Sequence, residues 1–108
     1  MVKSVNFSRK DEINSTSATP LQNAKNEVIT MVAGAITTRP DNETGEEVTV
    51  GIIITEEYGA MSTISKTAIR GLDLVIDYMN EEKVNTCQLK VNCGKSNAGR
   101  EFITLAII

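Results

Sequence analysis

Residue types that can carry acid–base, metal or nucleophilic chemistry are sparse in this sequence of 108 residues. Histidine is absent, so the side chain that most often moves protons near neutral pH and binds metals is missing. The two cysteines, Cys87 and Cys93, are too few for a structural zinc site, which needs four ligands. We therefore expect no enzymatic activity, no metal and no cofactor.

Two short patterns resemble fragments of ligand-binding motifs. Asp73 and Asp77 lie one helical turn apart and could hold a divalent cation, but such pairs usually belong to a solvated helix face. Residues 94–96, Gly-Lys-Ser, match the end of a phosphate-binding loop, but the earlier glycine, the preceding apolar strand and the following helix are missing. We interpret the first pattern as a solvated pair and the second as a turn.

The charged residues are segregated along the chain. Eleven Lys and Arg against 14 Asp and Glu give a net charge of -3, so a polyanionic partner would have to meet a local basic patch. Three basic residues fall in the last predicted hairpin, residues 86–108: Lys90, Lys95 and Arg100. Six carboxylates gather in the middle: Asp41, Glu43, Glu46, Glu47, Glu56 and Glu57.

The elements that must position these residues follow from hydrophobic periodicity and turn signals. Runs rich in β-branched residues predict strands over 26–39, 48–55, 60–64, 86–93 and 101–108. Gly34 marks a bulge or bend in the first of them. Ser65 is a helix cap, and the helix that it begins runs to about Lys83. Its apolar residues recur every three or four positions and face a core: Ala68, Ile69, Leu72, Val75, Ile76 and Met79.

The chain divides into an N-terminal arm and one domain. Residues 1–25 are rich in Ser, Thr, Asn and Lys, so little burial offsets the entropy of ordering them, and we expect a flexible arm. Residues 26–108 form the domain. Cys87 and Cys93 share one face of their strand with Leu89 and Val91, which indicates small core residues. Six residues apart on an extended strand is about 20 Å, so the two thiols are expected to be free.

The element order favours a mainly β, α+β fold. Three strands, one helix and two strands is the order of the five-stranded OB-like barrel, in which the helix lies between strands 3 and 4. The long first strand with its central glycine suits the bent strand of that barrel. An open antiparallel sheet with one helix on its face would use the same elements.

Three segments carry a resemblance to a known family: residues 42–47, Asn-Glu-Thr-Gly-Glu-Glu; residues 61–67, Met-Ser-Thr-Ile-Ser-Lys-Thr; and residues 94–105. With these segments, the chain over about residues 26–108 resembles the small single-stranded DNA-binding proteins of phages and mobile elements of Gram-positive bacteria. The resemblance implies binding of single-stranded DNA without sequence preference in replication or recombination. It also implies contacts with replication proteins. Residues 1–10 lack the apolar run of a secretory signal, so we expect a cytoplasmic location, that of the host cell for a phage-encoded protein.

That function needs cations along a groove and flat rings on which bases stack. The candidate phosphate-binding residues are Arg39, Lys66, Lys90, Lys95 and Arg100. The candidate stacking residues are Tyr58, which lies in a predicted turn, and Phe102, which shares a strand face with Thr104. A solvated hairpin and a solvated turn tyrosine would show the same pattern.

An acidic protein-binding module is the alternative function. The six carboxylates between Asp41 and Glu57 could mimic a nucleic acid and block a host factor or a defence protein. A homodimer is expected in the DNA-binding interpretation, through pairing of strand 26–39 across a two-fold axis. No stretch approaches the roughly 20 apolar residues of a membrane span, so no membrane partner is expected.

Overall fold

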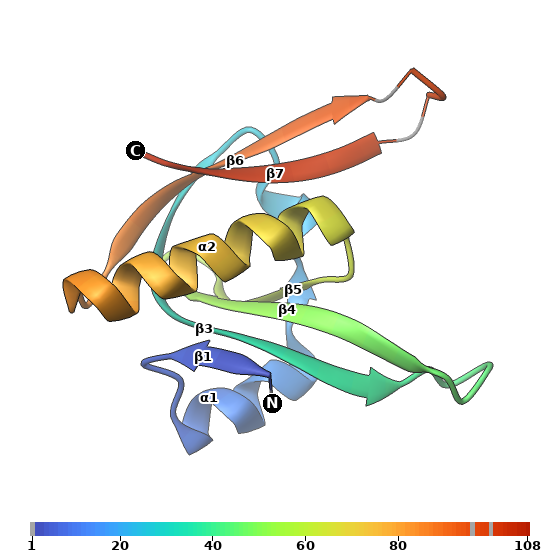
Figure 1. The fold of residues 1–108 in the computed structure, drawn as a ribbon, viewed down its shortest axis with the longest axis horizontal. Coiled ribbons are helices and arrows are strands. Elements are labelled where there is room, and N and C mark those ends of the chain that lie inside the picture. Colours follow the sequence, from blue (N-terminus) through green and yellow to red (C-terminus); the bar gives the residue numbers. More distant parts are fainter. Residues whose placement is uncertain (1, 96, 100) are drawn as a thin grey trace.

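The computed structural model describes residues 2–95, 97–99 and 101–108 as one curled, mainly antiparallel β-sheet wrapped around a long helix (Figure 1). The strands are β1 (Lys3–Val5), β2 (Thr19–Pro20), β3 (Val28–Pro40), β4 (Glu47–Thr55), β5 (Gly59–Thr63), β6 (Cys87–Lys95) and β7 (Glu101–Ile107). The α-helices are α1 (Arg9–Asn14) and α2 (Lys66–Glu82), and the 3-10 helices are η1 (Ser15–Ser17) and η2 (Leu21–Ala24). The strand order is β2-β5-β4-β3-β6-β7, and β1 pairs with β3.

Strand β3 is the spine of the sheet. Residues 31–40 pair with β4 along one edge, while residues 28–31 pair with β6 and residues 34–36 pair with β1 along the other. Because β3 is shared in this way, the sheet turns a corner and β6–β7 comes to lie across α2 from β3–β4 (Figure 1). Both edges of β3 are thus paired over most of its length, and among the described pairings its longest stretch open to a second copy is residues 37–40 on the edge that carries β1.

The sequence predicts a bulge or bend at Gly34, and the irregularity of β3 lies just before this residue. The register against β4 shifts between Met31 and Ala33, which is the position of the bulge. Gly34 has a different role, because a Cβ there would collide with the Met31 methyl and would lie 3.5 Å from Leu72 Cδ1. The glycine therefore allows α2 and the Met31 side chain to pack against the bent strand.

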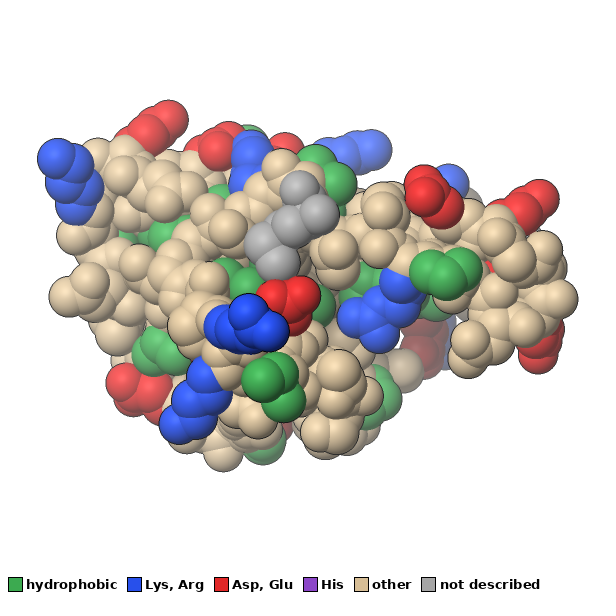
Figure 2. Space-filling model, turned by 90° about the horizontal axis from the view of Figure 1, so that it is seen from below, with side chains coloured by type: hydrophobic (Ala, Val, Ile, Leu, Met, Phe, Trp, Pro, Cys, Tyr) green, Lys and Arg blue, Asp and Glu red, His purple; other side chains and the backbone are tan. Residues whose placement is uncertain are grey.

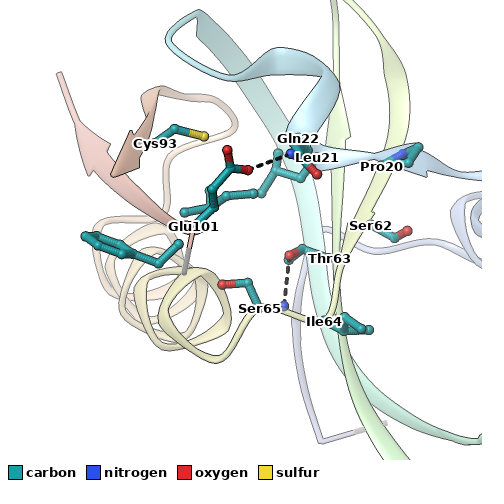
Figure 3. A pocket seen from close by; sticks show the side chains of 11 residues that line it. Pro20, Leu21, Gln22, Ser62, Thr63, Ile64, Ser65, Cys93 and Glu101 are labelled. Carbon is teal, nitrogen blue, oxygen red and sulfur yellow. Dashed lines mark hydrogen bonds between the residues drawn. The ribbon is translucent and has the colours of Figure 1, made fainter. Parts of the chain in front are cut away.

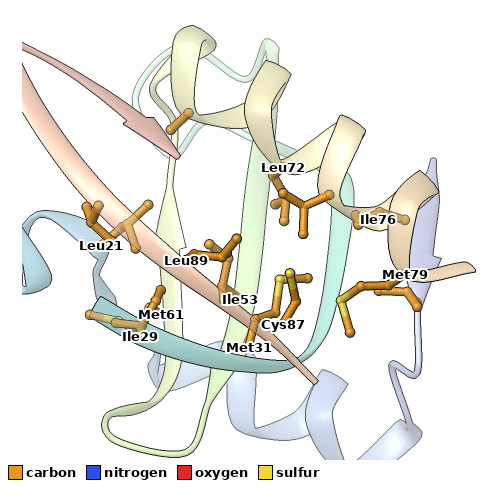
Figure 4. Packing of buried hydrophobic residues seen from close by; sticks show 14 of the residues in the cluster. Leu21, Ile29, Met31, Ile53, Met61, Leu72, Ile76, Met79, Cys87 and Leu89 are labelled. Carbon is orange, nitrogen blue, oxygen red and sulfur yellow. The ribbon is translucent and has the colours of Figure 1, made fainter. Parts of the chain in front are cut away.

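The predicted helix and its cap are confirmed. Ser65 Oγ accepts a hydrogen bond from the Ala68 amide at 3.4 Å, and α2 ends at Lys83, which has left-handed backbone angles. The apolar stripe of α2 is buried, with Ile69 only partly so. It packs on buried side chains of β3, β5 and β6, among them Met31, Met61 and Leu89 (Figure 4).

The closed five-stranded barrel with a single helix needs correction. The described residues form seven strands and two α-helices, with α2 between β5 and β6. In the described part of the chain β7 pairs only with β6 and the outer edge of β5 pairs with β2, so the sheet stays open between β2 and β7. Helix α2 lies along this seam: Thr67 Oγ1 donates to the Ile103 carbonyl at 2.8 Å, and a Cβ on Gly71 would be 3.5 Å from Leu105 Cβ. The helix thereby covers a strand edge that would otherwise be free.

The segment expected to be a flexible arm is packed against the sheet over residues 2–25. Val5 is 3% exposed and belongs to the main hydrophobic cluster, as do Leu21 and Ala24. Ser8 and Asp11 form a reciprocal capping box that begins α1. Val2 and Ile13 remain exposed, but the three buried residues fall where the curled sheet would leave its core uncovered, so their burial offsets the cost of ordering.

The remaining features of the fold bear on its chemistry. Cys87 and Cys93 are free thiols, as predicted, with Cys87 buried and Cys93 half-buried. Among the described helices, none has both the length and the apolar character needed to cross a membrane.

Candidate nucleic-acid interface

The β3–β4 and β6–β7 hairpins project at the same end of the molecule, where α2 begins (Figure 1). We call this the open end, and two adjoining cavities lie there. The first, which we call the seam cavity, measures about 390 Å³ and lies between η2, β5 and the β6–β7 hairpin (Figure 3). The second, the hairpin cavity, measures about 630 Å³ and lies between β4 and α2. Ile64 lines both cavities and is 69% exposed, so the two form one continuous surface with this side chain as its ridge.

The hairpin cavity has a basic wall. Lys66 and Arg70 lie one turn apart on α2, both are exposed, and both line the cavity. Lys66 was predicted from the sequence, whereas Arg70 was missed. The four-residue spacing of the two cations on one helix face is the signal that would have found it. The cavity also contains the carboxylates of Glu47 and Asp73.

The charge of Asp73 is compensated from the N-terminal segment. The Lys3 ammonium lies 2.5 Å from Asp73 Oδ1 and 2.8 Å from Asp77 Oδ1. The hydrogen bonds that the ammonium donates to Asp73 and Asp77 raise the pKa of Lys3, so the ammonium stays charged. The two aspartates, considered above as ligands of a divalent cation, thus bind a lysine that connects β1 to α2.

The β6–β7 hairpin carries an aromatic ring at the seam cavity. Phe102 pairs with Gly94, and a Cβ at Gly94 would lie only 2.7 Å from the ring, so the glycine leaves the space that the ring fills. Phe102 is half-buried and lines the seam cavity together with Cys93. The sequence left its exposure open, and the structure places it between the two extremes.

The other cations of the open end sit on the two hairpins. Lys95 is exposed at the end of β6, opposite Glu101. Arg39 is exposed near the end of β3, opposite Val48, which lines the hairpin cavity. Arg100 lies outside the described residues. Four of the seven predicted site residues, Arg39, Lys66, Lys95 and Phe102, are therefore brought to the same end of the molecule.

Tyr58 and Lys90 lie apart from that end, near the start of β3. Tyr58 Oη donates to Glu27 Oε2 at 2.6 Å, and this hydrogen bond raises the pKa of Tyr58. The Lys90 ammonium donates to the Asn26 carbonyl. Both polar groups are thus engaged on adjacent residues of the chain, so the seven predicted residues do not form a single site.

The outward face of β4 offers no binding surface. Val50 and Ile52 point away from α2, because a Cβ at Gly51 between them would point toward the helix and lie 3.0 Å from Leu72 Cδ2. Both are nevertheless buried, with 5% and 2% exposure. These two side chains are therefore covered by protein and are not open to a ligand.

The six carboxylates of the alternative function do not form one surface. Asp41, Glu43, Glu46 and Glu47 surround the β3–β4 turn, and acidic side chains are visible at this end of the molecule (Figure 2, right). Glu56 and Glu57 follow the other end of β4, about 26 Å away for a strand of this length. Glu57 accepts hydrogen bonds from Thr30 N and Thr30 Oγ1, both at 2.7 Å, and these lower its pKa.

Comparison with known proteins assigns the family. Residues 12–108 match the family described as phage single-stranded DNA-binding protein. A single-stranded DNA-binding protein of Bacillus phage B103 is 35% identical over 63 residues, which cover 58% of this chain and 52% of that protein. The alignment thus spans about half the length of this relative. No solved structure matches the chain. Because the family match extends over nearly the whole sequence, the chain belongs to the phage single-stranded DNA-binding protein family.

Proposed function

We propose that this protein binds single-stranded DNA without sequence preference and protects replication or recombination intermediates of a phage or mobile element. The observation that carries the proposal is the family match over residues 12–108. The relative from Bacillus phage B103 is named a single-stranded DNA-binding protein, which supports the same function. No catalytic step and no cofactor is part of the proposal.

The DNA strand runs across the open end in this proposal. Strands β3–β7 and α2 act as an OB-like unit, to which β1 and β2 are additions, and its two hairpins flank the ligand as loops do in OB folds. The phosphates lie against Lys66, Arg70, Lys95 and Arg39, and against Arg100 in the β6–β7 loop. The support is that all four described cations are exposed and that Lys66 and Arg70 line the hairpin cavity. Arg39 and Lys95 lie outside the lining of both cavities, but their strand partners belong to it, Val48 in the hairpin cavity and Glu101 in the seam cavity.

Tyr58 and Lys90 have a smaller role in this proposal than in the prediction from the sequence. Each donates a hydrogen bond within the protein, to Glu27 and to Asn26. Their separation from the open end supports a structural role at the start of β3. Only a strand long enough to continue around the sheet would reach them.

The local charge determines how such binding depends on salt. The net charge is -3, so the attraction comes from the few cations at the open end and not from the whole molecule. Neutralising about four phosphates of a single strand gives a slope of about -2.8 for log affinity against log salt concentration. Affinity then falls about 50-fold between roughly 50 mM and 200 mM salt.

Fluorescence anisotropy of a labelled oligonucleotide tests the proposal. We expect tight binding of single-stranded oligo(dT) at low salt, weaker binding at moderate salt, and much weaker binding of a duplex of the same length. Binding of the duplex as tightly as the single strand would contradict the proposal. If neither the single strand nor the duplex binds at low salt, the acidic protein-binding module is favoured. The remaining support for that function is the cluster of four carboxylates at the β3–β4 turn.

Self-association and replication partners are further parts of the proposal. Since β3 is interior, we propose that a second copy docks on the exposed apolar residues at the other end of the molecule. These are Leu74, Tyr78, Ile107 and Ile108. Sedimentation analysis of the wild type and of Leu74→Glu tests this dimer: a dimer that becomes a monomer in the variant supports it, and a monomeric wild type rejects it.

A further inference from the structure

We infer that the seam cavity is a pocket for one unpaired nucleobase of the bound strand. The inference rests on the proposed function and names what the cavity would hold. The volume of about 390 Å³ lies at the lower end of the range of about 300 to 1,000 Å³ found for small-molecule pockets. A flat heteroaromatic ring is the part of a nucleic acid that matches such a space.

The walls of the cavity suit a base and not a phosphate. Phe102, Leu21 and Ile64 provide apolar lining, with the Phe102 ring lying over Gly94 at the edge of the cavity. The charged group among the described lining residues is Glu101, which would repel a phosphate but can accept a hydrogen bond from a base N–H. Gln22 Nε2 already donates to Glu101 Oε2 at 3.2 Å, so these two polar groups face each other across the opening (Figure 3).

The position of the cavity connects it to the cations. Ile64 lines both cavities, so a strand whose phosphates lie against Lys66 and Arg70 can turn its next base over Ile64 into the seam. The absence of strand pairing between β2–β5 and β7 in the described residues leaves this space, because a further hydrogen-bonded strand there would fill it. The gap in the barrel is therefore a binding feature and not a packing defect.

Cys93 provides a built-in test, since it lines the cavity and is half-buried. The other thiol, Cys87, is buried in the core, and burial raises its pKa, so it reacts slowly. The rate of alkylation by iodoacetamide is measured on the folded wild type, with Cys93→Ser as the control that identifies the reacting thiol. Three states are compared: free protein, protein saturated with oligo(dT), and protein saturated with an abasic oligonucleotide of the same length.

We expect oligo(dT) to slow the alkylation of Cys93 severalfold and the abasic strand to leave the rate close to that of the free protein. Equal protection by both strands would overturn the inference, because the phosphate backbone alone would then cover the cysteine. Unchanged reactivity in a complex that anisotropy shows to be saturated would also overturn it, while the proposed function would stand. If neither strand binds, the proposed function itself fails.

The converse experiment blocks the cavity. Attachment of a bulky maleimide to Cys93 should weaken oligo(dT) binding by about 5- to 150-fold, the loss expected for one stacked base. Treatment of Cys93→Ser with the same reagent is the control and should leave the affinity unchanged. If the wild-type protein with maleimide on Cys93 binds oligo(dT) as tightly as the unmodified protein, the inference that the seam cavity holds a base is wrong.

Discussion

Single side chains tie distant segments of this small sheet together, and Glu57 is the clearest case. Its carboxylate accepts two hydrogen bonds from Thr30, at 2.7 Å each, and so fixes the β4–β5 turn against β3. These bonds lower the pKa of Glu57 below the value of 4.5 that an unfolded chain would have. The ionised form is therefore bound more strongly in the folded state than in the unfolded state.

This linkage predicts a pH-dependent effect of Glu57→Gln. A lowered pKa means that the stabilisation is present above about pH 4.5 and is lost as the pH falls through the lower folded value. The free energy of unfolding in urea should therefore be smaller for the variant than for the wild type at pH 7, and this difference should shrink at acidic pH. Glu56→Gln, an exposed neighbour, is the control. A difference that stays constant from pH 7 to pH 3 would contradict the linkage.

At the scale of elements, two glycines on either side of the α2 interface have opposite roles. Gly71 lies inside α2, and a Cβ there would meet Leu105 at ordinary contact distances of 3.5 to 3.7 Å. Gly34 lies in β3, where a Cβ would collide with the Met31 methyl and would lie 3.3 Å from the Ile52 carbonyl oxygen. The same substitution should thus have opposite signs at the two positions.

Gly71→Ala should raise the free energy of unfolding by about 0.5 to 1 kcal/mol, because alanine loses less backbone entropy in a helix than glycine does. Gly34→Ala should lower it by about 1 to 3 kcal/mol, since the buried Met31 side chain has to move. Urea denaturation followed by circular dichroism measures both. Destabilisation by Gly71→Ala would mean that α2 packs on β7 more tightly than the structure indicates.

At the scale of the whole molecule, the N-terminal segment is part of the fold. Val5→Ala removes a side chain that is 3% exposed in the main cluster, and should cost about 1 to 3 kcal/mol of stability. Val2→Ala, at a position 68% exposed, should have almost no effect. If both substitutions have negligible effects on the free energy of unfolding in urea, the result would contradict this packing and support the predicted flexible arm.

The sequence was sufficient for those features that depend on local periodicity. The Ser65 cap, the apolar stripe of α2 and the burial of Cys87 follow from spacing within one element. Docking of residues 2–25 could not be foreseen in the same way. Val5 and Leu21 are isolated apolar residues in a polar segment, and their burial depends on where the curled sheet leaves its core open.

The candidate site was predictable in its residue types but not in its grouping. Lys66, Lys95 and Phe102 meet only because the two hairpins and the start of α2 project at one end of the molecule. Tyr58 looked suitable as a turn residue, but its hydrogen bond to Glu27 joins parts of the chain that are 31 residues apart. Arg70 could not be predicted from the apolar stripe of α2, because that stripe defines the buried face of the helix and Arg70 is exposed.

The most direct measurement of the central claim is the salt dependence of oligo(dT) affinity in matched double variants. Lys66→Ala with Arg70→Ala removes both cations of the hairpin cavity, whereas Arg9→Ala with Lys10→Ala removes one Arg and one Lys from exposed positions of α1 that line neither cavity. The slope of log affinity against log salt should become less negative by about 1.4 in the first variant, for two lost phosphate contacts, and stay unchanged in the second. Equal slopes in both variants and the wild type would show that the open end does not hold the DNA backbone.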